Sequence, residues 1–253
     1  MSQYAVVAGG GMGIGEAIVR RLHADGWTVT IVDRVAAMAD AVANDLGERA
    51  HAECADITRP EQIAAVMDVV KARAGGAGVG AAVNAVGVYD ERRPLLKTDL
   101  ASYQRIMNVN VMGAFIFSQG IEPLLAANAS VVHIGSVNGI LAGTHIGAYK
   151  VSKAAMNMLA RCMASELARD PRRIRVNVVA PGWVDTPGER KVQAALGQPN
   201  ILDDPNAFKN IPMQRLTKAS EIADTVAFLC SARASGITGQ IVHVDCGIAN
   251  SEI

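Results

Sequence analysis

The sequence contains few aromatic residues. Tryptophan, tyrosine and phenylalanine make up 4% of its 253 residues, whereas half of all residues are hydrophobic. A core with few large rings must be filled mainly by alanine, valine, isoleucine and leucine, which is the usual content of a buried parallel sheet. The length suits one large α/β domain. Composition therefore favours a fold in which helices cover a buried sheet.

Net charge and paired cysteines are also lacking. Lys plus Arg and Asp plus Glu number 24 each, so no overall field attracts nucleic acid or anionic lipid, and we expect neither as a partner. Cys54, Cys162, Cys230 and Cys246 form no CxxC pair, and no histidine stands at metal-ligand spacing. We predict reduced, mostly buried thiols and no metal site.

The N-terminus has no basic region followed by a long apolar stretch, so we expect a cytoplasmic protein without a signal peptide or membrane anchor.

Seven short apolar runs recur along the chain with helical segments between them. This βαβ alternation predicts an α/β fold with a doubly wound, seven-stranded parallel sheet, forming a single Rossmann-type domain over residues 1–253. One stretch, at about 187–212, lacks the alternation and is rich in Gly, Pro, Asn and charge. We predict a substrate lid there, with a plain surface loop as the alternative. The seven runs are YAVVAG, WTVTIVD, AHAECAD, VGAAVNAVG, SVVHIGS, IRVNVVAPG and QIVHVD.

A glycine cluster follows the first predicted strand, from Gly9 to Gly15, and a segment with helical periodicity comes next. Glycine lets the backbone approach a pyrophosphate closely, and the N-terminus of a helix offers N–H groups and a positive dipole end. A tight strand-to-helix turn can need glycine for steric reasons alone, so the cluster is a weak signal by itself. Asp33 strengthens it. This residue ends the second predicted strand, where a carboxylate can accept hydrogen bonds from ribose hydroxyls of a dinucleotide.

Asp33 also indicates which dinucleotide is expected. Its negative charge would repel a 2′-phosphate, and Met12 brings no cation into the glycine turn, so the sequence predicts NAD(H) rather than NADP(H). The positive charge of Arg34, in contrast, would favour NADP(H) if it bound the 2′-phosphate. We interpret it as a solvated charge after the strand in preference to a phosphate ligand.

The sequence resembles the short-chain dehydrogenase/reductase family over almost its whole length. Six motifs carry the similarity and follow one another in the family's order. The resemblance implies a catalytic set of Asn110, Ser136, Tyr149 and Lys153, in which Lys153 also holds the nicotinamide ribose and Asn110 maintains a water-linked proton route to it. The motifs are AGGGMGIG, NAVG, NVNVMG around Asn110, IGSVNG with Ser136, YKVSK at 149–153 and NVVAPGWVDT at 177–186.

The residues of YKVSK also fit this chemistry on physical grounds. Hydride transfer between an alcohol carbon and nicotinamide requires a proton to leave or join the oxygen, and free tyrosine, with a pKa of about 10, is a weak acid. Residues four apart lie on one face of a helix, so the Lys153 ammonium can favour the Tyr149 phenolate. Ser136 follows a predicted strand and can donate to the substrate oxygen as charge develops. Taken singly, each residue could be merely structural; their joint order favours catalysis.

The resemblance extends the cofactor site beyond the glycine turn. It implies that Asp56 and Ile57 border the adenine, Asn84 and Gly87 the adjoining ribose, and Val184 and Thr186 the nicotinamide carboxamide. Ala8 stands where the family usually has threonine, and NAVG matches the family's NNAG only in part. The residues expected to bind the cofactor are Gly9, Gly11, Met12, Gly13, Ile14, Gly15, Asp33, Arg34, Asp56, Ile57, Asn84, Ala85, Gly87, Tyr149, Lys153, Pro181, Gly182, Val184 and Thr186.

A substrate pocket is expected between the segment after Ser136 and the predicted lid. The expected substrate residues are Ser136, Asn138, His145 and Tyr149, although a loop histidine such as His145 is more often a structural hydrogen-bonding group. Two predicted helices, 101–126 and 148–169, carry many apolar positions around their surfaces. The resemblance implies that such helices pair across two-fold axes in a homotetramer, with a dimer as the alternative.

These observations predict an NAD(H)-dependent oxidoreductase that interconverts a secondary alcohol and a ketone, with Tyr149 as general acid and base. A non-catalytic NAD(H)-binding sensor or scaffold with the same fold is an alternative from a different class. An epimerase or dehydratase is a third. The intact Ser136, Tyr149 and Lys153 disfavour the sensor, because a pure binding protein has no need of a perturbed phenol.

Overall fold

The strands form a single parallel sheet. The structure, a computed structural model, describes residues 3–89, 93–195, 205–209 and 211–250. Within these residues, a seven-stranded sheet has the order β3-β2-β1-β4-β5-β6-β7, and every paired strand is parallel. This confirms the predicted sheet and each of its strands. Their bounds are β1 (Tyr4–Ala8), β2 (Thr28–Asp33), β3 (Ala50–Cys54), β4 (Val79–Asn84), β5 (Leu125–Ile134), β6 (Arg175–Pro181) and β7 (Ile241–Val244).

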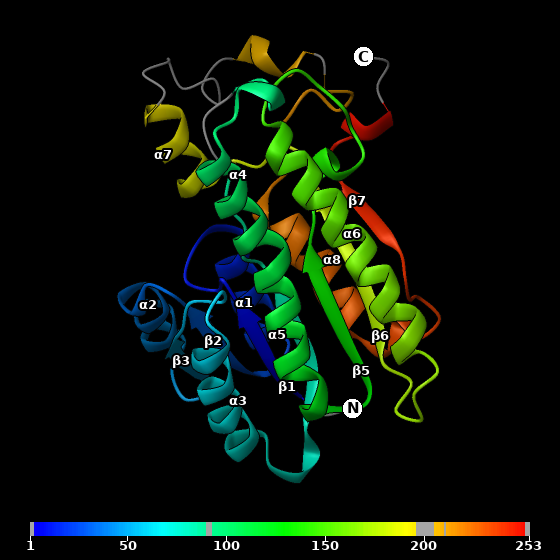
Figure 1. Cartoon of the computed structure of the whole chain (residues 1–253). Helices are drawn as coiled ribbons and strands as arrows, with labels where there is room; N and C mark the ends of the chain where they lie inside the picture. The colour runs from blue at the N-terminus through cyan, green and yellow to red at the C-terminus, as the bar shows by residue number, and fades with distance from the viewer. Residues whose placement is uncertain (1–2, 90–92, 196–204, 210, 251–253) are drawn as a thin grey trace.

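Helices cover both faces of this sheet (Figure 1). Side chains alternate between the two faces along each strand, so Ala5 and Val7 pack with one group of helices while Val6 and Ala8 pack with the other. The first group is α1 (Gly13–Ala24), α2 (Ala36–Leu46) and α8 (Ala219–Cys230); the second is α3 (Pro60–Ala74), α5 (Gly113–Ile121) and α6 (Gly147–Leu167). Two further helices, α4 (Leu100–Met107) and α7 (Pro187–Ala195), complete the helices labelled in Figure 1.

The core is mostly aliphatic, as the composition predicts. Phe117 is the one phenylalanine, tyrosine or tryptophan among the largest fully buried side chains of the described residues. Burying one large aliphatic side chain stabilises the fold by about 1.5–3 kcal/mol.

The four cysteines are free, but the prediction that they are mostly buried was wrong for two of them. Cys54 ends the edge strand β3 and Cys162 lies on the outer side of α6, so both are exposed.

The predicted helix 101–126 is divided into several elements. A π-helical turn at Asn108–Met112 joins α4 to α5, a 3₁₀ turn at Glu122–Leu124 follows, and β5 already begins at Leu125. Pro123 has no backbone N–H and cannot continue a helix. The prediction of helix up to residue 126 was therefore wrong. The second predicted helix, 148–169, is confirmed as α6 with each end shifted by no more than two residues.

No helix of the described chain is both long and apolar enough to cross a membrane.

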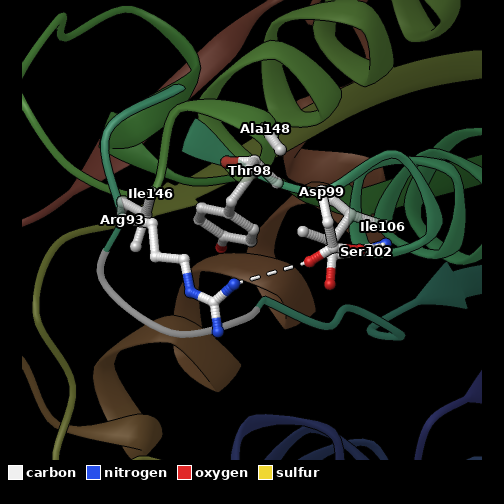
Figure 2. A pocket seen from close by; sticks show the side chains of 8 residues that line it. Arg93, Thr98, Asp99, Ser102, Ile106, Ile146 and Ala148 are labelled. Carbon is white, nitrogen blue, oxygen red and sulfur yellow. Dashed lines mark hydrogen bonds and ion pairs between the residues drawn. The ribbon is translucent and has the colours of Figure 1, made fainter. Parts of the chain in front are cut away.

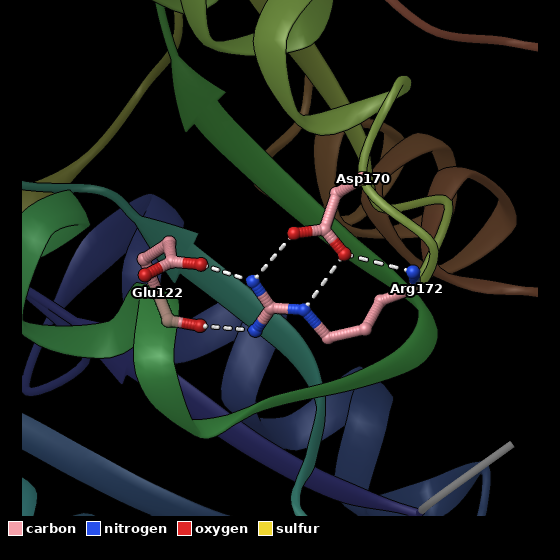
Figure 3. Close-up of polar contacts among 3 residues, drawn as sticks. All are labelled: Glu122, Asp170 and Arg172. Carbon is pink, nitrogen blue, oxygen red and sulfur yellow. Dashed lines mark hydrogen bonds and ion pairs between the residues drawn. The ribbon is translucent and has the colours of Figure 1, made fainter.

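Arg172 joins the turn before β6 to the turn before β5 (Figure 3). Its guanidinium donates to the two carboxylate oxygens of Asp170 at 2.9 and 3.0 Å and to the backbone carbonyl of Glu122 at 3.0 Å, and it also pairs with the Glu122 carboxylate. These bonds raise the pKa of Arg172 above its ordinary value. Both turns lie at the amino ends of their strands, whereas ligands of such sheets bind at the carboxyl ends. The role of Arg172 is therefore structural.

Candidate active site

The strand order reverses between β1 and β4. From this point β2 and β3 extend the sheet on one side, and β5, β6 and β7 extend it on the other. Ligands of open α/β sheets bind at the carboxyl ends of the strands where the order reverses. Gly9 leaves β1 here, and a Cβ atom on it would lie 3.0 Å from the backbone of Ala85, which leaves β4. The crevice between these two strands therefore leaves no room for a side chain at Gly9.

The glycine turn and Asp33 form one hydrogen-bonded unit. The Gly11 N–H donates to Asp33 Oδ2 at 3.1 Å, and the Val35 N–H donates to Asp33 Oδ1 at 3.1 Å. A Cβ atom on Gly11 would lie 2.8 Å from the same Oδ2, and one on Gly15 would lie 1.9 Å from the carbonyl oxygen of Gly9. The turn thus leaves no room for a side chain at Gly11 or Gly15, and a fixed carboxylate stands beside it. These residues fit the adenosine half of a dinucleotide.

The residues expected near the adenine lie next to this unit. The backbone N–H of Ala55 donates to the carbonyl of Asp33 at 3.1 Å, which places Asp56 just beyond it. Asp56 accepts from the backbone N–H and the hydroxyl of Thr58, at 2.9 and 2.7 Å, and these bonds lower its pKa. Ile57 is buried. Arg34 is exposed, in keeping with its interpretation as a solvated charge.

Ser136, Tyr149 and Lys153 come together from two elements. Ser136 follows β5, and α6 carries Tyr149 and Lys153 one turn apart. The Lys153 ammonium lies 5.6 Å from the centre of the Tyr149 ring and donates to the carbonyl of Ile134 at 2.8 Å. A hydrogen bond with Ser136 lowers the pKa of Tyr149. The three residues predicted to carry the chemistry therefore form one group.

Burial, rather than the lysine, has the largest effect on the Tyr149 phenol. It raises the pKa of Tyr149 to about 12, against the lowering by Ser136, and the negative charge of Glu189 raises it further. Burial also lowers the pKa of Lys153 to about 8. The net pKa shift of Tyr149 in the protein by itself is therefore upward, and the expected effect of the ammonium on the phenolate stays a prediction. Removing both groups from water disfavours their charged forms more strongly than the ammonium stabilises the phenolate at this distance.

Asn110 connects the loop after β4 to two helices. It is fully buried in the π-helical turn, where its side chain donates to the Val88 carbonyl at 2.8 Å and to Ser152 Oγ at 2.9 Å, and accepts from the Val88 N–H at 2.8 Å. A Cβ atom on Gly87 would lie 3.1 Å from the Lys153 amine and 3.8 Å from Asn110 Oδ1. Asn110 is thus close to Lys153, although its side chain forms hydrogen bonds with the backbone of the loop. Its proton-route role stays a prediction.

A cavity of about 610 Å³ opens beside Ser136, Tyr149 and Lys153. It brings together many of the predicted residues: the catalytic Ser136, Tyr149 and Lys153; the cofactor residues Ile14, Ala85, Gly87, Pro181, Gly182, Val184 and Thr186; and the substrate residues Asn138 and His145. Other predicted cofactor residues do not line this cavity: Gly9, Gly11, Met12, Gly13, Gly15, Asp33, Arg34, Asp56, Ile57 and Asn84. Asn84 is buried, and its side chain accepts from the Val86 N–H at 3.1 Å.

A second pocket, of about 110 Å³, is lined by Tyr149 and by residues of α4 such as Ser102 and Ile106, which Figure 2 shows with Asp99 and Arg93. Asp99 caps α4 by accepting from the Ser102 N–H at 2.8 Å, and Arg93 reaches to within 3.5 Å of the same carboxylate. Tyr149 and Ile146 line both pockets, so they form part of the wall between them. The smaller pocket belongs to the surroundings of the same tyrosine.

Tyr89, Lys150 and Trp183 are among the residues of the larger cavity that sequence analysis missed. The Tyr89 ring centre lies 5.7 Å from that of Tyr149, and the Lys150 amine donates to Asn138 Oδ1 at 2.5 Å. The sequence offered a signal for the two aromatic residues, because aromatic side chains are rare in this chain. In a chain with few aromatic residues, Tyr89 follows the NAVG motif and Trp183 follows the Pro-Gly of the last motif.

Comparison with known proteins agrees with this geometry. A family model described as enoyl-(acyl carrier protein) reductase matches residues 9–249. Galactitol 2-dehydrogenase (L-tagatose-forming) of Cereibacter sphaeroides is 34% identical over 248 residues, which cover 96% of this chain and 93% of that protein. The cis-4-hydroxycyclohexanecarboxylate dehydrogenase of Sinomonas cyclohexanicum is 35% identical over 248 residues, covering 96% and 95%. The chain belongs to the short-chain dehydrogenase/reductase family.

Solved structures of this short-chain dehydrogenase/reductase fold superpose closely on the chain. The 3-ketoacyl-(acyl-carrier-protein) reductase from Brucella melitensis, crystallised in complex with NADH, has a TM-score of 0.87 at 28% identity, covering 97% of this chain and 98% of that one. The single Rossmann-type domain is thereby confirmed. As a member of this family, the protein is an oxidoreductase that works with a nicotinamide cofactor.

Proposed function

We propose that the protein interconverts a secondary alcohol and a ketone with NAD(H), and that Tyr149 is the general acid and base. The observation that carries this proposal is the convergence of Ser136, Tyr149 and Lys153 on the wall of one cavity at the carboxyl ends of the strands. A serine hydroxyl, a phenol and an amine are together there. This arrangement supplies a proton donor, a hydrogen bond to the substrate oxygen and a cationic group.

Each residue has a distinct task in this reaction. A nicotinamide dinucleotide held at this site would supply the hydride in reduction and accept it in oxidation. In the direction of reduction, the Tyr149 phenol gives its proton to the carbonyl oxygen of the substrate, while the Ser136 hydroxyl donates a hydrogen bond to the same oxygen as negative charge develops. In the direction of oxidation, the phenolate takes the proton from the alcohol. The nearby Lys153 ammonium stabilises that phenolate once it forms.

The preference for NAD(H) rests on Asp33. Two backbone N–H groups, of Gly11 and Val35, hold its carboxylate at the end of β2 beside the glycine turn. A negative charge fixed there accepts hydrogen bonds from ribose hydroxyls and repels a 2′-phosphate. Pro181, Gly182, Val184 and Thr186 line the catalytic cavity, and we assign them to the nicotinamide end.

The segment 187–212 is proposed as the substrate lid. Among its described residues, α7 and the 3₁₀ turn at Pro205–Phe208 follow the last motif, and Gly188 and Glu189 of α7 line the catalytic cavity. The central part of the predicted lid, residues 196–204, and residue 210 lie outside the described residues. An element that lines a catalytic cavity from a long connection is suited to excluding water from the reaction.

We also propose that the protein assembles as a homotetramer through α5 and α6. Four apolar side chains expose between 39% and 56% of their surfaces: Met112 at the end of the π-helical turn, Phe115 on α5, and Val151 and Met158 on α6. Apolar side chains that gather on neighbouring helices of a water-exposed face favour burial against a second copy of the chain.

The Tyr149→Phe variant tests the assignment of the acid and base. Loss of the hydroxyl removes the proton donor but leaves the ring, so turnover is expected to fall by about 10² or more while NADH affinity stays unchanged. Turnover is measured from NADH absorbance with a panel of cyclic and aryl ketones and alcohols, and affinity by calorimetry. Near-normal turnover of the variant would refute the role of Tyr149.

The wild-type assays also distinguish the alternative functions. Tight NADH binding by the wild type without turnover of any substrate would support a sensor. Substrate conversion without net cofactor change would indicate an epimerase or dehydratase.

A further inference from the structure

The residue that follows Tyr149 in α6 turns inward to the loop after Ser136. Lys150 is half-buried, although lysine side chains usually extend into water. Its amine donates to Asn138 Oδ1 at 2.5 Å and to the Leu141 carbonyl at 3.1 Å. Burial lowers the pKa of Lys150, because leaving water disfavours the charged amine. The two bonds therefore offset a cost that an exposed lysine would not have.

The loop that Lys150 contacts makes few other hydrogen bonds. It begins with a 3₁₀ turn at Val137–Gly139, and the Leu141 N–H donates back to this turn at 3.0 Å. Beyond Leu141, residues 142–145 make no hydrogen bond within the described part of the chain. A Cβ atom on Gly143 would lie 3.4 Å from Lys150 Cε, so the lysine side chain also packs against this stretch. Lys150 therefore holds the loop against α6 at several points.

Asn138 connects Lys150 to the reacting groups. Its side-chain oxygen accepts from Lys150, and its backbone N–H donates to Ser136 Oγ at 3.1 Å. Ser136 also forms a hydrogen bond with Tyr149. The Asn138 N–H occupies one acceptor position of the serine oxygen, which leaves the hydroxyl proton directed away from the loop backbone. The placement of Asn138 therefore controls the direction of the hydroxyl that the proposed mechanism aims at the substrate oxygen.

We propose that Lys150 is a positioning residue, which holds Asn138 and through it orients the Ser136 hydroxyl for the reaction. This inference rests on the proposed alcohol–ketone function and adds a residue to it. The hydrogen bond from Ser136 strengthens as negative charge develops on the substrate oxygen. A displaced serine therefore slows the chemical step more than it weakens substrate binding. Lys150 does not need to touch the substrate in this role.

Lys150→Met tests the inference, because methionine keeps much of the side-chain length but has no N–H donor. The full-length variant is assayed with NADH and with the ketone of the panel that the wild type reduces fastest. We expect kcat to fall by about 10- to 100-fold, the usual scale for a misplaced reacting group. KM for the ketone should change by less than about threefold, and NADH affinity, measured by calorimetry, should stay unchanged. Lys150→Arg retains the charge and the donors and is expected to recover most of kcat.

A double variant shows whether Lys150 acts through Asn138. Asn138→Leu removes the acceptor at similar side-chain size and is expected to lower kcat by a similar factor. The combined variant should be no slower than the slower single variant, because the second change removes a contact that is already lost. Lys71→Met, at an exposed position of α3, is the matched control and should leave kcat and KM unchanged.

A further measurement needs no turnover. Amide hydrogen exchange of the peptide that contains residues 138–145 is expected to be faster in Lys150→Met than in the wild type, while the protection of β5 stays the same. If Lys150→Met does not fold, Lys150→Gln is measured in its place. Glutamine is uncharged and too short to reach both acceptors, so the same changes in kcat and in exchange are expected.

Three results would overturn the inference alone. The first is an unchanged kcat in Lys150→Met. The second is a raised KM at unchanged kcat, which would mean that Lys150 binds the substrate directly. The third is a combined variant in which the losses of the two single variants multiply, because the two residues would then act independently. If no alcohol or ketone in the panel is turned over with either nicotinamide cofactor, the proposed function itself fails, and the inference fails with it.

Discussion

The acid–base behaviour of Tyr149 results from neighbours that act in opposite directions. Burial raises its pKa to about 12, the hydrogen bond with Ser136 lowers it, and the charge of Glu189 raises it again. Lys153 is itself affected by burial, which lowers its pKa to about 8. At neutral pH the phenol is therefore protonated. This form is the one that the proposed ketone reduction requires.

The pH dependence of alcohol oxidation follows from the raised pKa of Tyr149. In the proposed mechanism oxidation needs the phenolate, so kcat/KM for oxidation is expected to increase as pH rises above neutrality. Glu189→Gln removes a charge that raises the pKa of Tyr149, so a larger fraction of phenolate forms at any given pH and the rise begins at lower pH. The pH profile of cyclohexanol oxidation measures this. A profile that is unchanged, or displaced to higher pH, would contradict the effect of Glu189, and Glu61→Gln, at an exposed position at the start of α3, is the charge-matched control.

Asp33 is expected to control the choice between the two nicotinamide cofactors. In Asp33→Ser the carboxylate no longer repels a 2′-phosphate, so the ratio of kcat/KM for NAD⁺ to that for NADP⁺ should fall by about tenfold or more, which corresponds to about 1.4 kcal/mol. Affinity for NAD⁺ should also decrease, because the bonds to Gly11 and Val35 that order the turn are weakened. Asp40→Ser, at an exposed position of α2, serves as the control. An unchanged ratio would mean that another residue distinguishes the ribose groups.

At the scale of elements, the connection between α4 and α5 brings Asn110 to the site. A continuous α-helix would present a different face at this position, whereas the π-helical turn at Asn108–Met112 inserts an extra residue into the helical repeat. The buried side chain of Asn110 is then able to meet the backbone of Val88 and the hydroxyl of Ser152. The loop after β4 is thereby held against α6, which carries Tyr149.

Asn110→Ala is expected to destabilise this junction between elements. The change removes three hydrogen bonds and leaves the half-buried backbone groups of Val88 without their partner, so the free energy of unfolding should fall by about 2–4 kcal/mol. Urea unfolding measures the change. Ser118→Ala, which removes one hydrogen bond to the Ala114 carbonyl from the buried face of α5, should lower it by about 1 kcal/mol. If the free energy of unfolding falls equally in the two variants, the contacts of Asn110 stabilise the protein no more than a single buried hydrogen bond does.

For the whole molecule, the exposed apolar side chains of α5 and α6 predict an assembly. A charge at the centre of such a face opposes association, because it must lose its water on burial. Phe115→Glu and Met158→Glu are therefore expected to reduce the mass of the particle in sedimentation experiments, while Val35→Glu, at an apolar position outside these helices that is 39% exposed, should not. A wild-type particle with the mass of a single chain would contradict the proposed tetramer.

Much of the fold follows from local sequence patterns. The seven strands were predictable because each is a short apolar run bounded by glycine or polar residues, and a strand buried on both faces of a parallel sheet has that composition. The helix from residue 101 was predicted too long, since apolar residues continue from α5 into β5. Pro123 was a local signal that it should end. The π-helical turn had no comparable signal, because it depends on how Asn110 contacts the loop after β4.

The sequence by itself determined the spacing of Tyr149 and Lys153, because four residues make about one helical turn, and it determined the glycines that a close turn beside β4 requires. Only the tertiary structure decided which distant residues meet these groups. Tyr89 and Glu189 are separated by 100 positions and are joined by one hydrogen bond, and no local pattern specifies such a pair. The direction of the Tyr149 pKa shift was decided in the same way. Desolvation depends on every atom packed around the hydroxyl, and that packing exists only after the chain has folded.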